Sequence, residues 1–174
     1  MNYRRRVMGA FLAFPFANSV FARACRSTAP QTEGPFFKTD TPLRTSFIEK
    51  SSTSRFLLAG TVLSRNCRPV PNALLEFWHA DEEGAYDNRG FRYRGHQHAD
   101  AQGRYRLETI VPALYPGRAR HIHVKVQAPG RRVLTTQLYF PNDPGNARDF
   151  LFKEELVIRA PTRGEGRFDF VVEA

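Results

Sequence analysis

Short apolar runs alternate with clusters of glycine, proline, asparagine and aspartate over residues 56–172. Runs bounded in this way by turn-forming residues are typical of β-strands. Only residues 150–155 are compatible with a helical turn, and the sequence contains no internal repeat. The pattern therefore predicts an all-β fold, specifically an antiparallel two-sheet β-sandwich. The predicted strands cover residues 56–62, 73–78, 105–110, 119–127, 133–140, 156–159 and 168–172.

Two stretches lack a strand pattern. Residues 25–54 have scattered apolar positions and several prolines, which predicts an extended N-terminal arm that lies on the domain. Residues 89–100 form a long polar stretch that holds Tyr93, His96 and His98, and we interpret it as a loop. Long loops within a compact domain are usually functional or disordered, so this stretch is a place to look for a site.

The first residues have the features of an export signal. Residues 4–6 are arginines, residues 7–17 form a short apolar run, and small residues then permit cleavage after Ala22 or after Ala24. The run is too short to span a bilayer comfortably, so we expect no stable membrane anchor. We divide the chain into an export signal at residues 1–24 and one domain at residues 25–174, and we expect a periplasmic or extracellular protein.

The route of export has two interpretations. Residues 3–8 resemble a twin-arginine signal, which serves proteins that fold around a cofactor before export, but a general secretory signal fits as well. Lipoprotein processing at Cys25 is disfavoured because Arg23 stands where a small residue is expected. In an oxidising compartment Cys25 and Cys67 either form one disulfide or stay apart, and a metal role is less favoured without a CxxC-like spacing.

Composition is ordinary apart from charge. The 174 residues are 41% hydrophobic and 25% charged, which fits one globular domain. The net charge of +9 is compatible with binding to nucleic acid or to another anionic polymer. The arginines are scattered along the chain, however, and no nucleic-acid-binding module is recognisable, so we expect no nucleic-acid partner.

Side chains that could bind a metal or a substrate are concentrated in residues 115–126. In a strand, His121 and His123 point to one face, while the apolar residues at positions 122, 124 and 126 point to the other. Two imidazoles beside an upstream tyrosine and arginine indicate a metal centre next to a charged substrate site. A merely polar strand face is the alternative interpretation.

Tyrosines supply the other candidate ligands. Tyr86 and Tyr115 both precede the two histidines in the chain. His79, His96 and His98 are rival candidates for the role of ligand. A phenolate is a hard anionic donor that favours ferric over ferrous iron. Two phenolates and one hydroxide would neutralise a trivalent ion and leave both imidazoles to bind as neutral ligands. The alternative for either tyrosine alone is a packed aromatic side chain.

A series of motifs in fixed order resembles the intradiol ring-cleavage dioxygenases of the protocatechuate 3,4-dioxygenase and catechol 1,2-dioxygenase type. The resemblance extends from residue 28 to about residue 140, and it suggests a secreted single-domain member. Each motif is weak alone, but the order and spacing together are specific. They are TAPQTEGPFF at 28–37, GTV at 60–62, PVPNA at 69–73, EFWHAD at 76–81, GAY at 84–86, FRYRG at 91–95, DAQGRY at 100–105, TIVP at 109–112, HIH at 121–123 and LTTQ at 134–137.

The resemblance implies a ferric iron site and a reaction. The family's tyrosinate ligands correspond to Tyr86 and Tyr115, and its histidine ligands to His121 and His123. The family's active-site arginine and glutamine correspond to Arg118 and Gln137. The implied reaction is cleavage of a catechol-type aromatic diol by O2 to a cis,cis-muconate, with Tyr86 as the ligand that stays bound and Tyr115 as a catalytic base.

The resemblance also marks departures and open questions. Phe37 stands where many members carry tyrosine, which puts in doubt a hydroxyl contact from the arm to the substrate. His96 and His98 have no ligand role in the family. The substrate is open among catechol, substituted catechols, protocatechuate and hydroxyquinol, and both homo- and hetero-oligomers are compatible. The rival hypotheses are a non-catalytic secreted β-sandwich that binds a metal or aromatic ligand, and a structural sandwich that holds anionic polymers.

Overall fold

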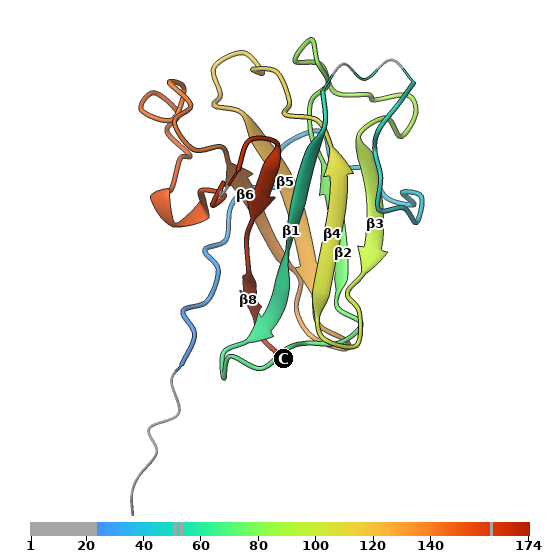
Figure 1. The fold of residues 1–174 in the computed structure, drawn as a ribbon, viewed down its shortest axis with the longest axis vertical. Helices are drawn as coiled ribbons and strands as arrows, with labels where there is room; N and C mark the ends of the chain where they lie inside the picture. Colours follow the sequence, from blue (N-terminus) through green and yellow to red (C-terminus); the bar gives the residue numbers. More distant parts are fainter. Residues whose placement is uncertain (1–23, 51, 53, 161) are drawn as a thin grey trace, which may run out of the picture.

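The computed structural model describes residues 24–50, 52, 54–160 and 162–174. Two four-stranded sheets pack face to face, which confirms the predicted all-β sandwich with an extended arm (Figure 1). The strands are β1 Phe56–Ser64, β2 Leu74–Trp78, β3 Arg94–His98, β4 Arg104–Thr109, β5 His121–Gln127, β6 Leu134–Tyr139, β7 Glu165–Arg167 and β8 Phe170–Val172.

One sheet has the order β3-β2-β5-β6 and is antiparallel throughout. In the other sheet β1 pairs antiparallel with β4 but parallel with both β7 and β8. Antiparallel pairs thus dominate the sandwich, as predicted, and the two short C-terminal strands add parallel pairs to the second sheet. The C-terminal segment returns over the domain after β6 and runs along β1 in the same direction, first as β7 and then as β8.

Most predicted strands are confirmed within a few residues, and two predictions are wrong. The stretch interpreted as a polar loop contains β3, an edge strand that pairs with β2. The strand expected at residues 156–159 is reduced to single bridges at Val157 and Arg159. A 3-10 helix at Glu154–Leu156 precedes these bridges, slightly later than the helical turn expected at 150–155.

The core lies between the sheets and follows the alternation of each strand. Leu75 and Phe77 of β2 point inward, as do the apolar residues of β5 at positions 122, 124 and 126, and all of these are at most 1% exposed. They meet Leu58 and Val62 of β1 across the sandwich. The histidines of β5 consequently face outward from the sandwich, away from this core.

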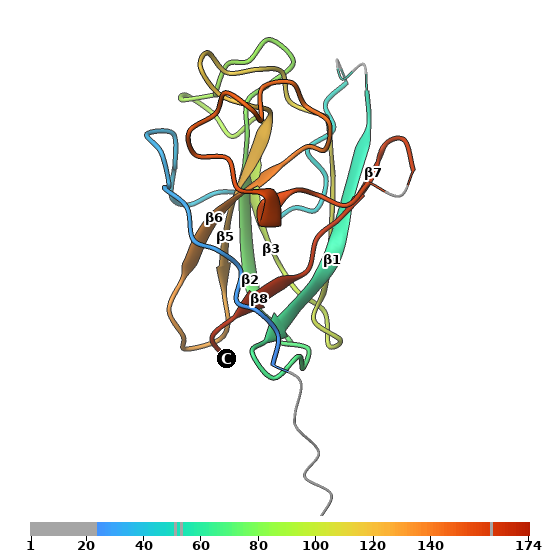
Figure 2. The same ribbon diagram turned by 90° about the vertical axis from the view of Figure 1, so that its left-hand side faces the viewer.

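The arm covers that outward face. Figure 2 shows the arm in blue on the side of the β3-β2-β5-β6 sheet that is remote from β1 and β7. The backbone N–H of Gln31 donates to Thr135 O (2.9 Å), and Thr136 Oγ1 donates to Ala29 O (2.8 Å). The Cys25–Cys67 disulfide ties the start of the arm to the turn after β1, so of the two cysteine alternatives the structure has the disulfide.

Further along, the arm closes both sheets at one side of the sandwich. Leu43 forms a bridge with His96 of β3, and Ser46 forms a bridge with Glu108 of β4. Because β3 and β4 are edge strands of different sheets, residues 42–47 supply hydrogen-bond partners to two edges that would otherwise be open.

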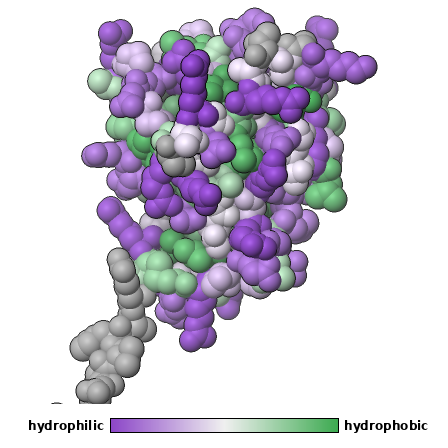
Figure 3. All heavy atoms as spheres, viewed as in Figure 1, coloured by the Kyte–Doolittle hydropathy of each residue, from purple (hydrophilic) through white to green (hydrophobic). Residues whose placement is uncertain are grey.

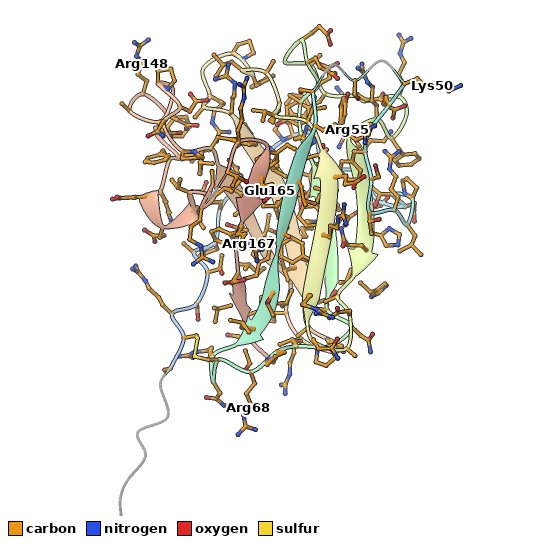
Figure 4. All side chains as sticks on the ribbon, viewed as in Figure 1. Lys50, Arg55, Arg68, Arg148, Glu165 and Arg167 are labelled. Carbon is orange, nitrogen blue, oxygen red and sulfur yellow. A yellow bond between two sulfur atoms is a disulfide. The ribbon has the colours of Figure 1, made fainter. Side chains whose placement is uncertain are left out.

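On the face seen in Figure 3, hydrophilic residues, drawn in purple, are numerous, with smaller green hydrophobic areas between them. Arg55, Glu165 and Arg167 lie on the outward side of the sheet that contains β1, as labelled in Figure 4. Within the described residues no helix is long and apolar enough to cross a membrane. The predicted export signal lies outside the described residues, apart from Ala24.

Candidate metal centre

A row of polar and aromatic side chains crosses the outward face of the β3-β2-β5-β6 sheet. The strand registers place Arg94, Trp78, His123 and Gln137 opposite one another in that order. Side chains on the outer face of a sandwich are usually solvated, yet these four are between 0% and 3% exposed. The arm buries them, and it thereby converts a sheet surface into an enclosed site.

Three of the four predicted ligands converge at this site. The Nε2 atoms of His121 and His123 are 3.1 Å apart, and the hydroxyl of Tyr86 lies 3.2 Å from His121 Nε2. The ring of Tyr115 is 5.7 Å from the ring of Tyr86, measured between centroids. The loop after β2 contributes Tyr86 and the loop before β5 contributes Tyr115, and both loops lie at the same end of the sandwich (Figure 1).

The histidines are in the state that metal binding requires. His121 Nδ1–H donates to the carbonyl of Ala119 (2.7 Å), which leaves the lone pair on Nε2. Burial lowers the pKa of His121 to about 4 and lowers the pKa of His123 well below its usual value, and neighbouring positive charges add to the effect. Both imidazoles are therefore neutral at pH 7, with lone pairs available to a cation.

The two tyrosines differ in their surroundings. Tyr86 is buried, and the ring of Phe36 stacks on it at 4.3 Å with an interplanar angle of 11°. Burial raises the pKa of the Tyr86 phenol, so this side chain becomes a phenolate only beside a strong positive charge. Tyr115 is half-buried and meets the edge of Phe36 at 5.4 Å. Its hydroxyl has no hydrogen-bond partner among the described residues.

The donor set fits ferric iron. Two nitrogens that bind one ion at about 2.1 Å and subtend roughly a right angle stand about 3 Å apart, close to the observed 3.1 Å. No group of three His, Cys, Asp or Glu side chains in the described part of the chain is arranged to hold a metal, so a site here must use the phenol oxygens. Two phenolates with two neutral imidazoles suit a hard trivalent ion.

Arg118 is held beside the site by a buried ion pair. Its Nε donates to both carboxylate oxygens of Asp149 (3.1 and 2.9 Å), and its Nη2 donates to Gln137 Oε1 (2.6 Å). The hydroxyl of Tyr139 lies 3.3 Å from the same Nη2. Gln137 Nε2 donates to Thr32 O (2.9 Å), so both ends of the Gln137 amide are engaged. Nη1 of Arg118 has no partner among the residues that the structure describes.

The rival histidines lie elsewhere. His79 is buried between the sheets, where Nδ1–H donates to Ala80 O (2.7 Å) and Nε2 accepts from Thr109 Oγ1 (2.6 Å). His96 and His98 lie on β3, and His96 contacts the hydroxyl of Thr41 at 3.3 Å. None of the three reaches Tyr86 or the two histidines of β5.

Sequence reasoning missed several residues around the site. Asp149 and Tyr139 hold Arg118, but neither carries a local pattern that reveals this role. Phe37, which stands where many family members carry tyrosine, packs on Trp78 with 5.1 Å between ring centroids, and the Lys125 ammonium lies over its ring. Phe36 is the arm residue that contacts both tyrosines, and its place in the GPFF motif was the available signal.

Comparisons with known proteins identify the family of the chain. A family model described as Dioxygenase matches residues 32–172. The solved dioxygenase domain of a dioxygenase carbohydrate-binding protein fusion from Streptomyces sp. SirexAA-E is 52% identical, with a TM-score of 0.81 over 86% of this chain and 99% of that one. Hydroxyquinol 1,2-dioxygenase from Pseudomonas putida DLL-E4 is 27% identical, with a TM-score of 0.73 over 88% of this chain and 68% of that one.

Catechol 1,2-dioxygenase from Acinetobacter baylyi is 30% identical over 172 residues, which cover 80% of this chain and 55% of that protein. The chain thus spans about half the length of the first curated relatives it matches, at 55% and 48%. The chain belongs to the intradiol ring-cleavage dioxygenases.

Proposed function

We propose that the protein is a non-haem Fe(III) enzyme that cleaves a catechol-type aromatic diol with O2 to a cis,cis-muconate-type product. The observation that carries the proposal is the convergence of three ligand atoms in a buried site. His121 Nε2 lies 3.2 Å from Tyr86 Oη and 3.1 Å from His123 Nε2. The names of the relatives, among them catechol, chlorocatechol and hydroxyquinol dioxygenases, support this class of substrate without selecting one of them.

Tyr86, Tyr115, His121 and His123 would hold the iron. When bound, ferric iron would lower the pKa of the oxygen donors and accept the two oxygens of the diol. Tyr86 is the ligand that stays, because it is buried under Phe36 and adjacent to His121. Tyr115 is the catalytic base, because its less buried hydroxyl has no competing partner in the described structure and can take a substrate proton.

Arg118 would stabilise negative charge that develops on the substrate ring. Asp149 fixes the Nε edge of its guanidinium and Gln137 fixes Nη2, which leaves Nη1 without a partner among the described residues. A pre-oriented cation in a dry site contributes several kcal/mol to a transition state, on the order of 3 kcal/mol for one donor. Gln137, the second catalytic residue expected from the family, would act by holding Arg118 and the arm, since both ends of its amide are engaged.

Oxygen consumption tests the proposal. The iron-loaded mature protein is mixed with a panel of catechol, substituted catechols, protocatechuate and hydroxyquinol in an oxygen electrode, and its visible spectrum is recorded. We expect a tyrosinate-to-iron absorption band and uptake of O2 with at least one diol. A protein that shows the band and binds catechols without O2 uptake would favour the non-catalytic binding module. Iron-loaded protein without any such band would refute the four-ligand site.

We further propose export through the predicted signal at residues 1–24 to the periplasm or the extracellular space. The positive n-region, the short apolar run and the small residues at the cleavage sites support this. Fractionation of cells that express the full chain tests it, together with sequencing of the mature amino terminus. Replacing Arg4 and Arg5 by lysine should block export through the twin-arginine route and leave general secretion unchanged.

A further inference from the structure

Arg94 is a buried cation without an acidic partner. Arg94 is 1% exposed. It lies on β3, at one end of the row formed with Trp78, His123 and Gln137 on the outward face of the sheet. Nε donates to Asp87 O (2.9 Å), Nη1 donates to Phe36 O, and Nη2 lies 3.5 Å from Asn88 Oδ1. Arg94 forms no ion pair within the described residues, although a buried guanidinium is normally paired with a carboxylate.

The nearest carboxylate is committed elsewhere. Oδ1 of Asp87 accepts the backbone N–H groups of Arg89 (2.9 Å) and Gly90 (2.7 Å), and Oδ2 accepts that of Arg92 (2.9 Å). This carboxylate therefore organises the turn after Tyr86 and does not contact the guanidinium. Carbonyl oxygens alone accept hydrogen bonds from Arg94, and the Asp87 carboxylate acts on its charge only from a longer distance, without an ion pair.

The Arg94 guanidinium lies close to the buried ligand. Its central carbon is 6.0 Å from the centroid of the Tyr86 ring. Its two main contacts also enclose Tyr86: Asp87 follows Tyr86 in the chain, and Phe36 stacks on the Tyr86 ring at 4.3 Å. One side chain thus joins the ligand loop to the arm that covers it. It also places a permanent positive charge next to the tyrosine whose charged form the site needs.

We propose that Arg94 is a positioning residue for Tyr86: it joins the ligand loop to the arm through two carbonyl groups and holds a positive charge beside the Tyr86 ring. The inference rests on the proposed iron site. A cation whose central carbon lies 6.0 Å from the centre of the Tyr86 ring, in a poorly solvated environment, interacts with that side chain more strongly than it would in water. Residues that orient and tune metal ligands in this way typically change metal affinity 10- to 100-fold when they are replaced.

Three variants test the proposal on the full mature protein. Arg94→Gln removes the charge, Arg94→Lys keeps it but cannot reach both carbonyl groups, and Arg92→Gln is the matched control. Arg92 lies two residues before Arg94, in the segment that leads into β3. Its guanidinium carbon is 5.0 Å from the centroid of the Tyr93 ring, and it forms ion pairs with Asp81 and Glu82. The measurements are the tyrosinate-to-iron absorption band, iron retention against a chelator and far-UV circular dichroism.

We expect Arg94→Gln to shift the band to longer wavelength, because an unbalanced phenolate gives up its electron to iron more easily, and to weaken iron binding roughly 10- to 100-fold. Arg94→Lys should keep the wild-type band but bind iron several-fold more weakly, and Arg92→Gln should behave as wild type. A folded Arg94→Gln protein with the wild-type band and affinity would overturn the proposal.

Two further outcomes separate the possible failures. If neither Arg94 variant folds while Arg92→Gln does, Arg94 is a purely structural residue and the proposal is overturned. If the wild-type protein itself binds iron without a tyrosinate band, the proposed iron site fails, whatever the variants do. The wild-type spectrum therefore tests the proposed function, and the difference between Arg94 and Arg92 variants tests the inference.

Discussion

Replacing Asp149 by asparagine should destabilise the protein by much more than loss of an exposed charge does. The side chain of Asp149 is 0% exposed and the side chain of its partner Arg118 is 14% exposed, and the closest distance between carboxylate and guanidinium is 2.9 Å. Besides Arg118, one carboxylate oxygen accepts the N–H of Ala119 (3.0 Å) and the other accepts that of Leu151 (2.9 Å). Every contact of this carboxylate is thus an accepted hydrogen bond.

The magnitude follows from those contacts. An asparagine keeps one oxygen and presents an NH2 group in place of the other, so in either orientation two donors face each other in a buried place. Arg118 also loses its only ion pair in the described structure. Breaking one side of a buried pair typically lowers the free energy of unfolding by about 3–5 kcal/mol. We therefore expect a loss of about 3–5 kcal/mol for Asp149→Asn.

Urea denaturation of the wild type and of Asp149→Asn at pH 7 gives this difference from the two transition midpoints. The control is Glu155→Gln, which removes the exposed pair with Arg26 (side chains 84% and 43% exposed) and should change stability by about 0–1 kcal/mol. If Asp149→Asn lies within about 1 kcal/mol of the wild type, the ion pair does not hold Arg118 and the role assigned to it is wrong.

Three other outcomes are expected. Burial lowers the pKa of His79 to about 4, so its contribution to the stability of the iron-free protein should be full above about pH 6.5 and fall by up to about 3 kcal/mol as pH drops toward 4. In His79→Gln this contribution to the pH dependence should disappear from a series of denaturation curves, while that of His121 and His123 remains. Serine at both Cys25 and Cys67, which are 42 residues apart, should lower the free energy of unfolding by up to about 4 kcal/mol, and two reactive thiols in the non-reduced wild type would contradict the bond. Tyr115→Phe should slow turnover while iron stays bound, whereas loss of all iron would make Tyr115 mainly structural.

The ligand pair of β5 could be predicted from local periodicity because a strand places alternate residues on opposite faces. The sequence of β3 could not be recognised in this way. Its residues are mostly polar, and Gly95, its second residue, is required by long-range packing, since a Cβ there would lie 2.8 Å from the ring of Phe47. Such a glycine resembles a loop residue until the arm segment that packs on it is known.

The sequence by itself determined the all-β class, the extended arm, the order of the motifs and the residues proposed to bind iron. Each of these is encoded by neighbours in the chain or by a motif with fixed spacing. Only the tertiary structure decided that the arm buries the outward face of a sheet and that Asp149, 31 residues after Arg118, holds that arginine. It also decided that Arg94 lies beside Tyr86. Burial and ion pairing depend on which distant segments meet in space, and no local pattern records that.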